Sequence, residues 1–161
     1  MTRRPDLARG FQLEQPPLIV PWGISEAEFV LLFPEGALRH VSDGYFTATC
    51  VSLGGTRHEL GFHFHGCPGG GLCELEFFRL DAPLSQTYPD WQQRLESLLG
   101  EPDVTESGDE GYKRHAWQIG PVHVVHTVID HFGPAEFVGM AYGARADRLS
   151  DAALPWADRD R

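Results

Sequence analysis

The segment "ELGFHFHGCPGGGLCELEFF", residues 59–78, decides the fold that we expect of this chain. Each half alternates apolar and polar residues, which is the period of a β-strand whose successive side chains point to opposite faces. Three consecutive glycines separate the halves, so the segment predicts a β-hairpin. A register slip of one residue would set a phenylalanine opposite a glutamate, so the apolar side chains must share one face. The predicted core face therefore carries Phe62, Phe64, Leu75 and Phe77.

The polar side chains of the hairpin should share the opposite face, and they are His63, His65, Glu74 and Glu76. Imidazole and carboxylate ligands suit zinc or iron, so this face could hold a metal ion in a small metal-assisted enzyme. A half-exposed sheet face also carries His and Glu as ordinary cross-strand pairs. We prefer this second interpretation, and no cofactor is expected.

Two helices are predicted around the strands. Residues 24–36 begin with Ser25 and Glu28 at the spacing of a capping box, and a proline and a glycine end the segment. Residues 85–102 place a tryptophan and several leucines on one apolar stripe.

The remaining segments complete a predicted α+β domain. Strand patterns occur in residues 37–53, 115–129 and 135–143, in addition to the hairpin. Short connections favour antiparallel neighbours. We therefore expect a single antiparallel sheet of about six strands with two helices packed on one face. The expected organisation is a weakly ordered lead-in over 1–17, one domain over 18–143, and a charged C-terminal tail over 144–161.

Composition narrows the function classes. The chain has 23 acidic and 13 basic residues, a formal net charge of −10, which would repel a nucleic acid. No stretch reaches the roughly 18 apolar residues of a membrane helix, and no export signal is recognisable. The three cysteines are therefore expected to be reduced thiols of a cytoplasmic protein.

The acidic residues are concentrated in the loop 101–111, a surface suited to a basic protein partner. The predicted partner-binding residues are Asp43, Glu101, Asp103, Glu106, Asp109 and Glu110. The chain shows neither a G-x-S-x-G elbow nor a local Cys–His signature, so no catalytic residue is predicted. We expect a binding protein rather than an enzyme.

The succession "PWGISEAEF", "LGFHF…GGGLCELEFF", "WQQRLESLLGEP" and "WQIG" resembles small stand-alone bacterial immunity proteins of polymorphic toxin systems. The likeness covers residues 20–142 as a pattern of elements, and no site residue is carried over from it. It implies an acidic, non-catalytic domain that binds and neutralises a partner toxin.

Overall fold

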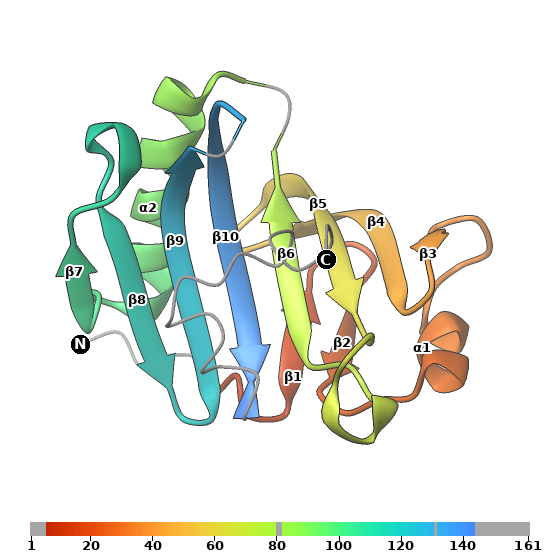
Figure 1. The fold of residues 1–161 in the computed structure, drawn as a ribbon. Helices are drawn as coiled ribbons and strands as arrows, with labels where there is room; N and C mark the ends of the chain where they lie inside the picture. Colours follow the sequence, from red (N-terminus) through yellow and green to blue (C-terminus); the bar gives the residue numbers. More distant parts are fainter. Residues whose placement is uncertain (1–5, 80–81, 131, 144–161) are drawn as a thin grey trace.

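Antiparallel strands dominate residues 6–79, 82–130 and 132–143, which are the residues that the computed structural model describes (Figure 1). In this part of the chain eight strands form one sheet, two more form a small ribbon, and there are two α-helices. The main sheet contains, in spatial order, β3 (Arg39–Ser42), β4 (Tyr45–Ser52), β5 (Thr56–His63), β6 (Glu74–Phe78), β10 (Pro134–Tyr142), β9 (Val122–Asp130), β8 (Arg114–Ile119) and β7 (Val104–Glu106). The other elements are β1 (Gly10–Leu13) and β2 (Leu18–Pro21) of the ribbon, α1 (Glu26–Leu32), α2 (Leu84–Leu99), and the 3-10 turns η1 (Pro68–Gly70) and η2 (Asp109–Gly111).

The predicted α+β architecture with a single six-stranded sheet is wrong, because the described chain is mostly β and forms two sheets. One cause lies in residues 115–129, which form two strands rather than one. Gly120, with a φ of 59°, and Pro121 make the turn between β8 and β9. The other cause is that β7 is short and exposed at every residue, so it shows no apolar alternation.

The main sheet consists of two four-stranded meanders, β3–β6 and β7–β10, connected by α2. They join in the middle of the sheet, where β6 pairs with β10 from Phe77 opposite Val138 to Glu74 opposite Ala141. Strands β3 and β7 therefore lie at opposite edges of the sheet (Figure 1).

The hydrophobic core lies between one face of the main sheet and a layer made of α1, α2 and the ribbon. Phe29 of α1 packs on Phe62 of β5, with ring centroids 4.7 Å apart. The ring of Phe77 on β6 receives Phe11 of the ribbon at 5.3 Å and Trp91 of α2 at 6.0 Å. Each fully buried side chain of this size stabilises the fold by roughly 1.5–3 kcal/mol.

The inward half of the hairpin prediction is confirmed. Phe62, Phe64, Leu75 and Phe77 all belong to the buried core. The predicted start of the first helix is also confirmed, because the Ser25 side chain accepts a hydrogen bond from the backbone N–H of Glu28 at 3.2 Å.

The segment predicted as a lead-in contributes to the core. Leu7, Phe11 and Leu13 are buried, so part of this segment packs into the core. The predicted tail 144–161 lies outside the described residues. In the part of the chain that the structure covers, neither helix has the length and apolar character needed to cross a membrane.

The structure also differs from the expectation of three reduced cysteines. Cys67 and Cys73 form a disulfide whose Cα atoms are 5.7 Å apart, and Cys50 is the free, buried cysteine. Strand alternation alone would place Cys67 and Cys73 on opposite faces. The turn η1 ends that alternation, because Gly69 has a φ of 71° and folds the chain back between them.

Candidate functional site

The predicted metal set on the hairpin is divided by the fold. His63 lies directly opposite Glu74 in the β5–β6 register, and its imidazole Nε2 contacts the Oε1 of Glu76. His65 lies beyond the end of β5, where it is exposed. Among the described residues no group of three or more His, Cys, Asp or Glu side chains could hold a metal ion. The His and Glu side chains form a cross-strand cluster instead.

That cluster is buried, which differs from the expected exposed face. The exposed fractions are 7% for His63 and 2% for both Glu74 and Glu76. Tyr45 of β4 stacks on the His63 ring with centroids 4.4 Å apart. The strand parity was therefore predicted correctly, whereas the exposure of this face was not.

The predicted acidic residues fall into three groups. Asp43 sits in the β3–β4 turn, at the opposite edge of the sheet from the loop 101–111. Asp103 and Glu106 have internal partners, since Asp103 accepts the backbone N–H of Gln118 at 2.7 Å and Glu106 pairs with Arg114 at 2.7 Å. Glu101, which is exposed just after α2, completes this second group.

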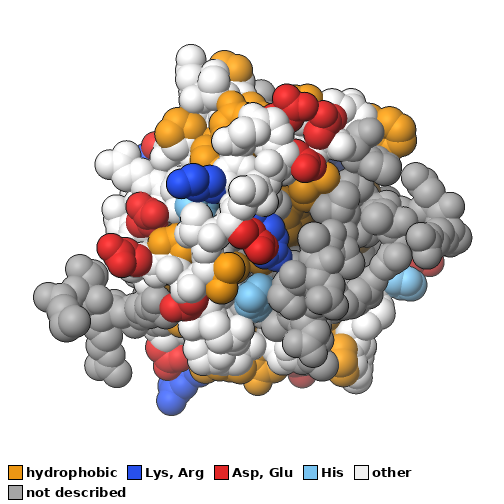
Figure 2. Space-filling model, turned by 60° about the vertical axis from the view of Figure 1, so that its left-hand side comes forward, with side chains coloured by type: hydrophobic (Ala, Val, Ile, Leu, Met, Phe, Trp, Pro, Cys, Tyr) orange, Lys and Arg blue, Asp and Glu red, His pale blue; other side chains and the backbone are white. Residues whose placement is uncertain are grey.

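Asp109 and Glu110 form the third group with Asp130, a residue that sequence analysis missed. We call these three residues the acidic triad. The Asp109 Oδ2 accepts the backbone N–H of Asp130 at 3.0 Å. A hydrogen bond with Asp130, and then the negative charges of Asp130 and Asp109, raise the pKa of Glu110. Asp130 ends β9, so only the pairing of strands brings it to η2. Figure 2 shows acidic side chains gathered near the top of the molecule, with hydrophobic ones beside them.

A cleft adjoins the acidic triad on the other side of the β9–β10 turn. Its volume is about 490 Å³, within the range of ligand-binding pockets. Most of its lining is apolar, and three polar side chains, Arg79, Thr87 and Glu136, reach its wall. Sequence analysis did not predict this cleft, because its walls come from β6, α2 and the β9–β10 turn.

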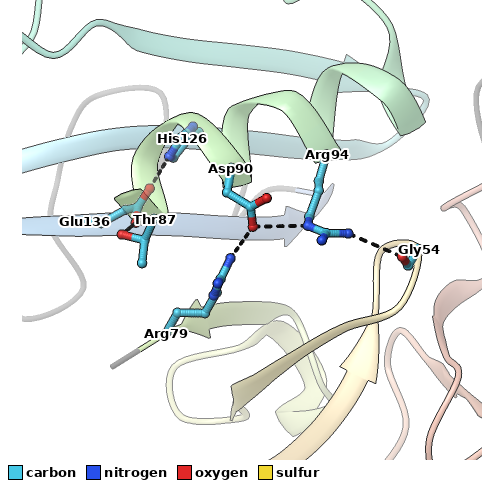
Figure 3. A network of polar contacts seen from close by, with 7 residues as sticks. All are labelled: Gly54, Arg79, Thr87, Asp90, Arg94, His126 and Glu136. Carbon is cyan, nitrogen blue, oxygen red and sulfur yellow. Dashed lines mark hydrogen bonds and ion pairs between the residues drawn. The ribbon is translucent and has the colours of Figure 1, made fainter. Parts of the chain in front are cut away.

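A buried polar network lies behind the cleft (Figure 3). Glu136 accepts hydrogen bonds from the Thr87 hydroxyl at 2.6 Å and from the Nε2 of His126 at 2.5 Å. The Nδ1 of His126 lies 2.7 Å from the Oε1 of Gln92. The Nε2 of Gln92 donates to a carboxylate oxygen of Glu96 at 3.0 Å, which fixes the amide orientation.

This network fixes the position of the His126 ring. The ring is fully buried, and both of its nitrogens face oxygen atoms, Nε2 that of Glu136 and Nδ1 that of Gln92. Burial and then the charge of His126 lower the pKa of His115, whose ring centroid is 6.5 Å away. Both nitrogens of His126 are occupied by structural partners, so the ring is not poised to take a proton from a substrate.

A second charged pair, Arg79 and Asp90, contributes Arg79 to the wall of the cleft. The guanidinium of Arg79 contacts Asp90 and lies over the Trp91 ring, 5.8 Å from its centroid. Arg94 donates to Asp90 at 3.1 Å and to the carbonyl oxygen of Gly54 at 3.3 Å (Figure 3). Burial opposes ionisation of Asp90, but the hydrogen bonds from Arg79 and Arg94 outweigh it and lower the pKa of Asp90.

The free cysteine lacks the properties of a nucleophile. Burial, followed by the charge of Glu59, raises the pKa of Cys50 to about 12, so the sulfur stays a thiol at neutral pH. Its neighbour His58 is buried as well, and the Nε2 of that ring lies 2.5 Å from the Oγ of Ser52. The three side chains are a buried polar cluster of the core.

No protein family model, curated protein or solved structure matches this chain. The function proposed below rests on the chain's own residues.

Proposed function

We propose that this chain is a non-catalytic binding protein that neutralises a basic protein partner, as immunity proteins neutralise toxins. The acidic triad is the observation that carries the proposal. The fold holds three carboxylates together on its surface. Repulsion between their negative charges contributes to the raised pKa of Glu110. A cationic side chain of a partner would relieve that repulsion, because an opposite charge favours the ionised form of a carboxyl group.

The overall charge of the chain supports the same proposal. With a net charge of −10, long-range attraction would speed the encounter with a basic protein, and the triad would then fix the orientation of binding. The state of the potentially reactive side chains agrees with a binding role, since His126 is fixed between Gln92 and Glu136 and Cys50 is a buried thiol.

The test takes the product of the adjacent gene as the partner, and the proposal requires that product to be a basic protein. We expect isothermal titration calorimetry to show binding that weakens steeply as the salt concentration rises. The variant Asp109→Asn/Glu110→Gln/Asp130→Asn should weaken binding at least about tenfold and flatten the salt dependence. Asparagine retains the oxygen that accepts the backbone hydrogen bonds, so the η2 conformation should persist.

A matched control removes the same number of charges elsewhere. Glu26→Gln/Glu28→Gln/Glu35→Gln neutralises three exposed carboxylates on α1 and just after it. Binding should change less than about twofold, since general attraction affects association more than the final contacts. Equal losses in both triple variants would show that charge acts without a site, and an adjacent product that does not bind would contradict the proposal.

A cytoplasmic location is a separate part of the proposal. Cytoplasmic thiols are kept reduced, so this location requires the Cys67–Cys73 bond to be open in the cell. Thiol labelling after rapid acid quenching of cells would detect all three cysteines as free thiols if the protein works there. Protection of Cys67 and Cys73 from labelling would instead place the protein in an oxidising compartment.

A further inference from the structure

The cleft beside the acidic triad exists because the two meanders separate at one end of the sheet. Strand β6 pairs with β10 only as far as Phe77 opposite Val138, whereas β9 pairs with β10 as far as Pro134. The end of β6, the first turns of α2 and residues 132–136 line the opening. The apolar side chains that line the opening are Phe77, Phe78, Trp91, Ile129, Phe132 and Pro134.

Two charged side chains, Arg79 and Glu136, reach the wall of the cleft, and each has a partner within the fold. Arg79 is paired with Asp90, and Glu136 is paired with His126. Both charged side chains are therefore held by partners within the fold, so the wall presents mainly apolar surface to an occupant. An apolar group would enter without leaving a buried charge unpaired, whereas an ion would lose its hydration for little return.

The rim of the cleft is acidic. Asp130 lies opposite the cleft residue Pro134 in the β9–β10 register, and its Oδ1 accepts the backbone N–H of Gly133 at 3.2 Å. The acidic triad therefore adjoins the apolar cleft through Asp130, at the end of β9. Phe132, which follows shortly after Asp130, is 92% exposed and adds apolar surface to the lining of the cleft.

We infer that the cleft receives one large apolar side chain of the partner, flanked by basic residues that contact the acidic triad. This inference rests on the proposed function and names the chemistry of the partner segment. Apolar walls select the anchor, and the acidic rim selects the charges beside it. An apolar anchor surrounded by a polar rim is the usual anatomy of a protein interface.

Two-dimensional NMR with short peptides tests the inference without knowledge of the natural partner. The probe is the peptide acetyl-Gly-Arg-Trp-Arg-Gly-amide, with Gly-Arg-Ala-Arg-Gly and Gly-Glu-Trp-Glu-Gly as matched peptides. We expect the Arg-Trp-Arg peptide to shift the amide signals of Gly133 and Ala135 and the indole signal of Trp91. Its dissociation constant should be on the order of 1 mM, as for a single anchored side chain.

The matched peptides separate the two parts of the inference. Replacing the tryptophan by alanine should weaken binding about 30-fold, equivalent to about 2 kcal/mol of apolar burial. The Glu-Trp-Glu peptide should bind at least about tenfold more weakly than the Arg-Trp-Arg peptide, because its charges face the acidic triad. Equal binding by these two peptides would overturn the role of the rim.

Two variants locate the site. Phe132→Ala should weaken binding of the Arg-Trp-Arg peptide, and the exposure of this residue makes unfolding an implausible cause. Ala135→Phe, also at an exposed position, should fill the cleft and compete with the peptide. No cleft signal shifting with any peptide would overturn the inference. Shifts confined to Asp109, Glu110 and Asp130 would also overturn it, while leaving the proposed function intact.

Discussion

Glu136→Gln tests how strongly the contact between the fully buried His126 and Glu136 stabilises the fold. The substitution keeps the size of the side chain and removes the negative charge that His126 faces at 2.5 Å. Breaking one partner of a buried ion pair costs about 3–5 kcal/mol, because the remaining charge is left without compensation. The Glu136 side chain is 12% exposed, so we expect the lower end of that range, about 3 kcal/mol.

Urea titration at pH 7, followed by tryptophan fluorescence, measures this loss of unfolding free energy. With a slope of about 2 kcal/mol per molar urea, a loss of about 3 kcal/mol lowers the midpoint by about 1.5 M. Glu106→Gln is the matched control, since it removes the same charge from a pair with Arg114 in which the Glu106 side chain is 54% exposed. The control should lose less than about 1 kcal/mol. Equal small losses in both variants would refute a strongly stabilising contact between His126 and Glu136.

Three further predictions concern other titratable groups. Burial lowers the pKa of His58, so below about pH 6.5 the unfolded chain binds a proton at this residue that the folded chain does not bind. The free energy of unfolding should therefore fall as the pH drops below about 6.5. Urea titrations at pH 7 and pH 5 should show a smaller difference in this free energy for His58→Gln. The raised pKa of Glu110 means that its charged form opposes folding, so Glu110→Gln should raise the melting temperature at pH 7 and have no such effect at pH 3. With the Cys67–Cys73 disulfide intact, Ellman's reagent should detect no thiol in the folded protein and one thiol, that of Cys50, in denaturant. A thiol that reacts rapidly in the folded protein would contradict the burial of Cys50.

Local patterns predicted the elements whose side chains face the core. The alternation of Phe62 and Phe64 with polar residues, and the capping of the first helix by Ser25, are properties of neighbouring residues, and the structure confirms both. Edge strands carry no such signal, because a strand such as β7 buries none of its side chains. A single turn at Gly120 separates β8 from β9. Strand-forming residues on both sides of this turn made the two strands look like one in the sequence.

The candidate site was less predictable than the core, because pairing over long distances builds it. The whole of β8 and the rest of β9 lie between Glu110 and Asp130 in the sequence, and the two residues meet only in the folded sheet. Similarly, Thr87 and Glu136 are 49 residues apart in the chain and share a hydrogen bond. The burial of His63 could not be read from its alternation with phenylalanine, since that pattern gives the side of a strand and not what covers it.

The junction between β6 and β10 has a consequence for assembly of the protein. Each meander on its own would present a bare hydrogen-bonding edge in the middle of the future sheet, and the two edges belong to segments on either side of α2. At high concentration during refolding, the first half of one molecule can therefore complete the second half of another. Such reciprocal exchange would yield intertwined dimers that retain native pairing and convert to monomers only by unfolding.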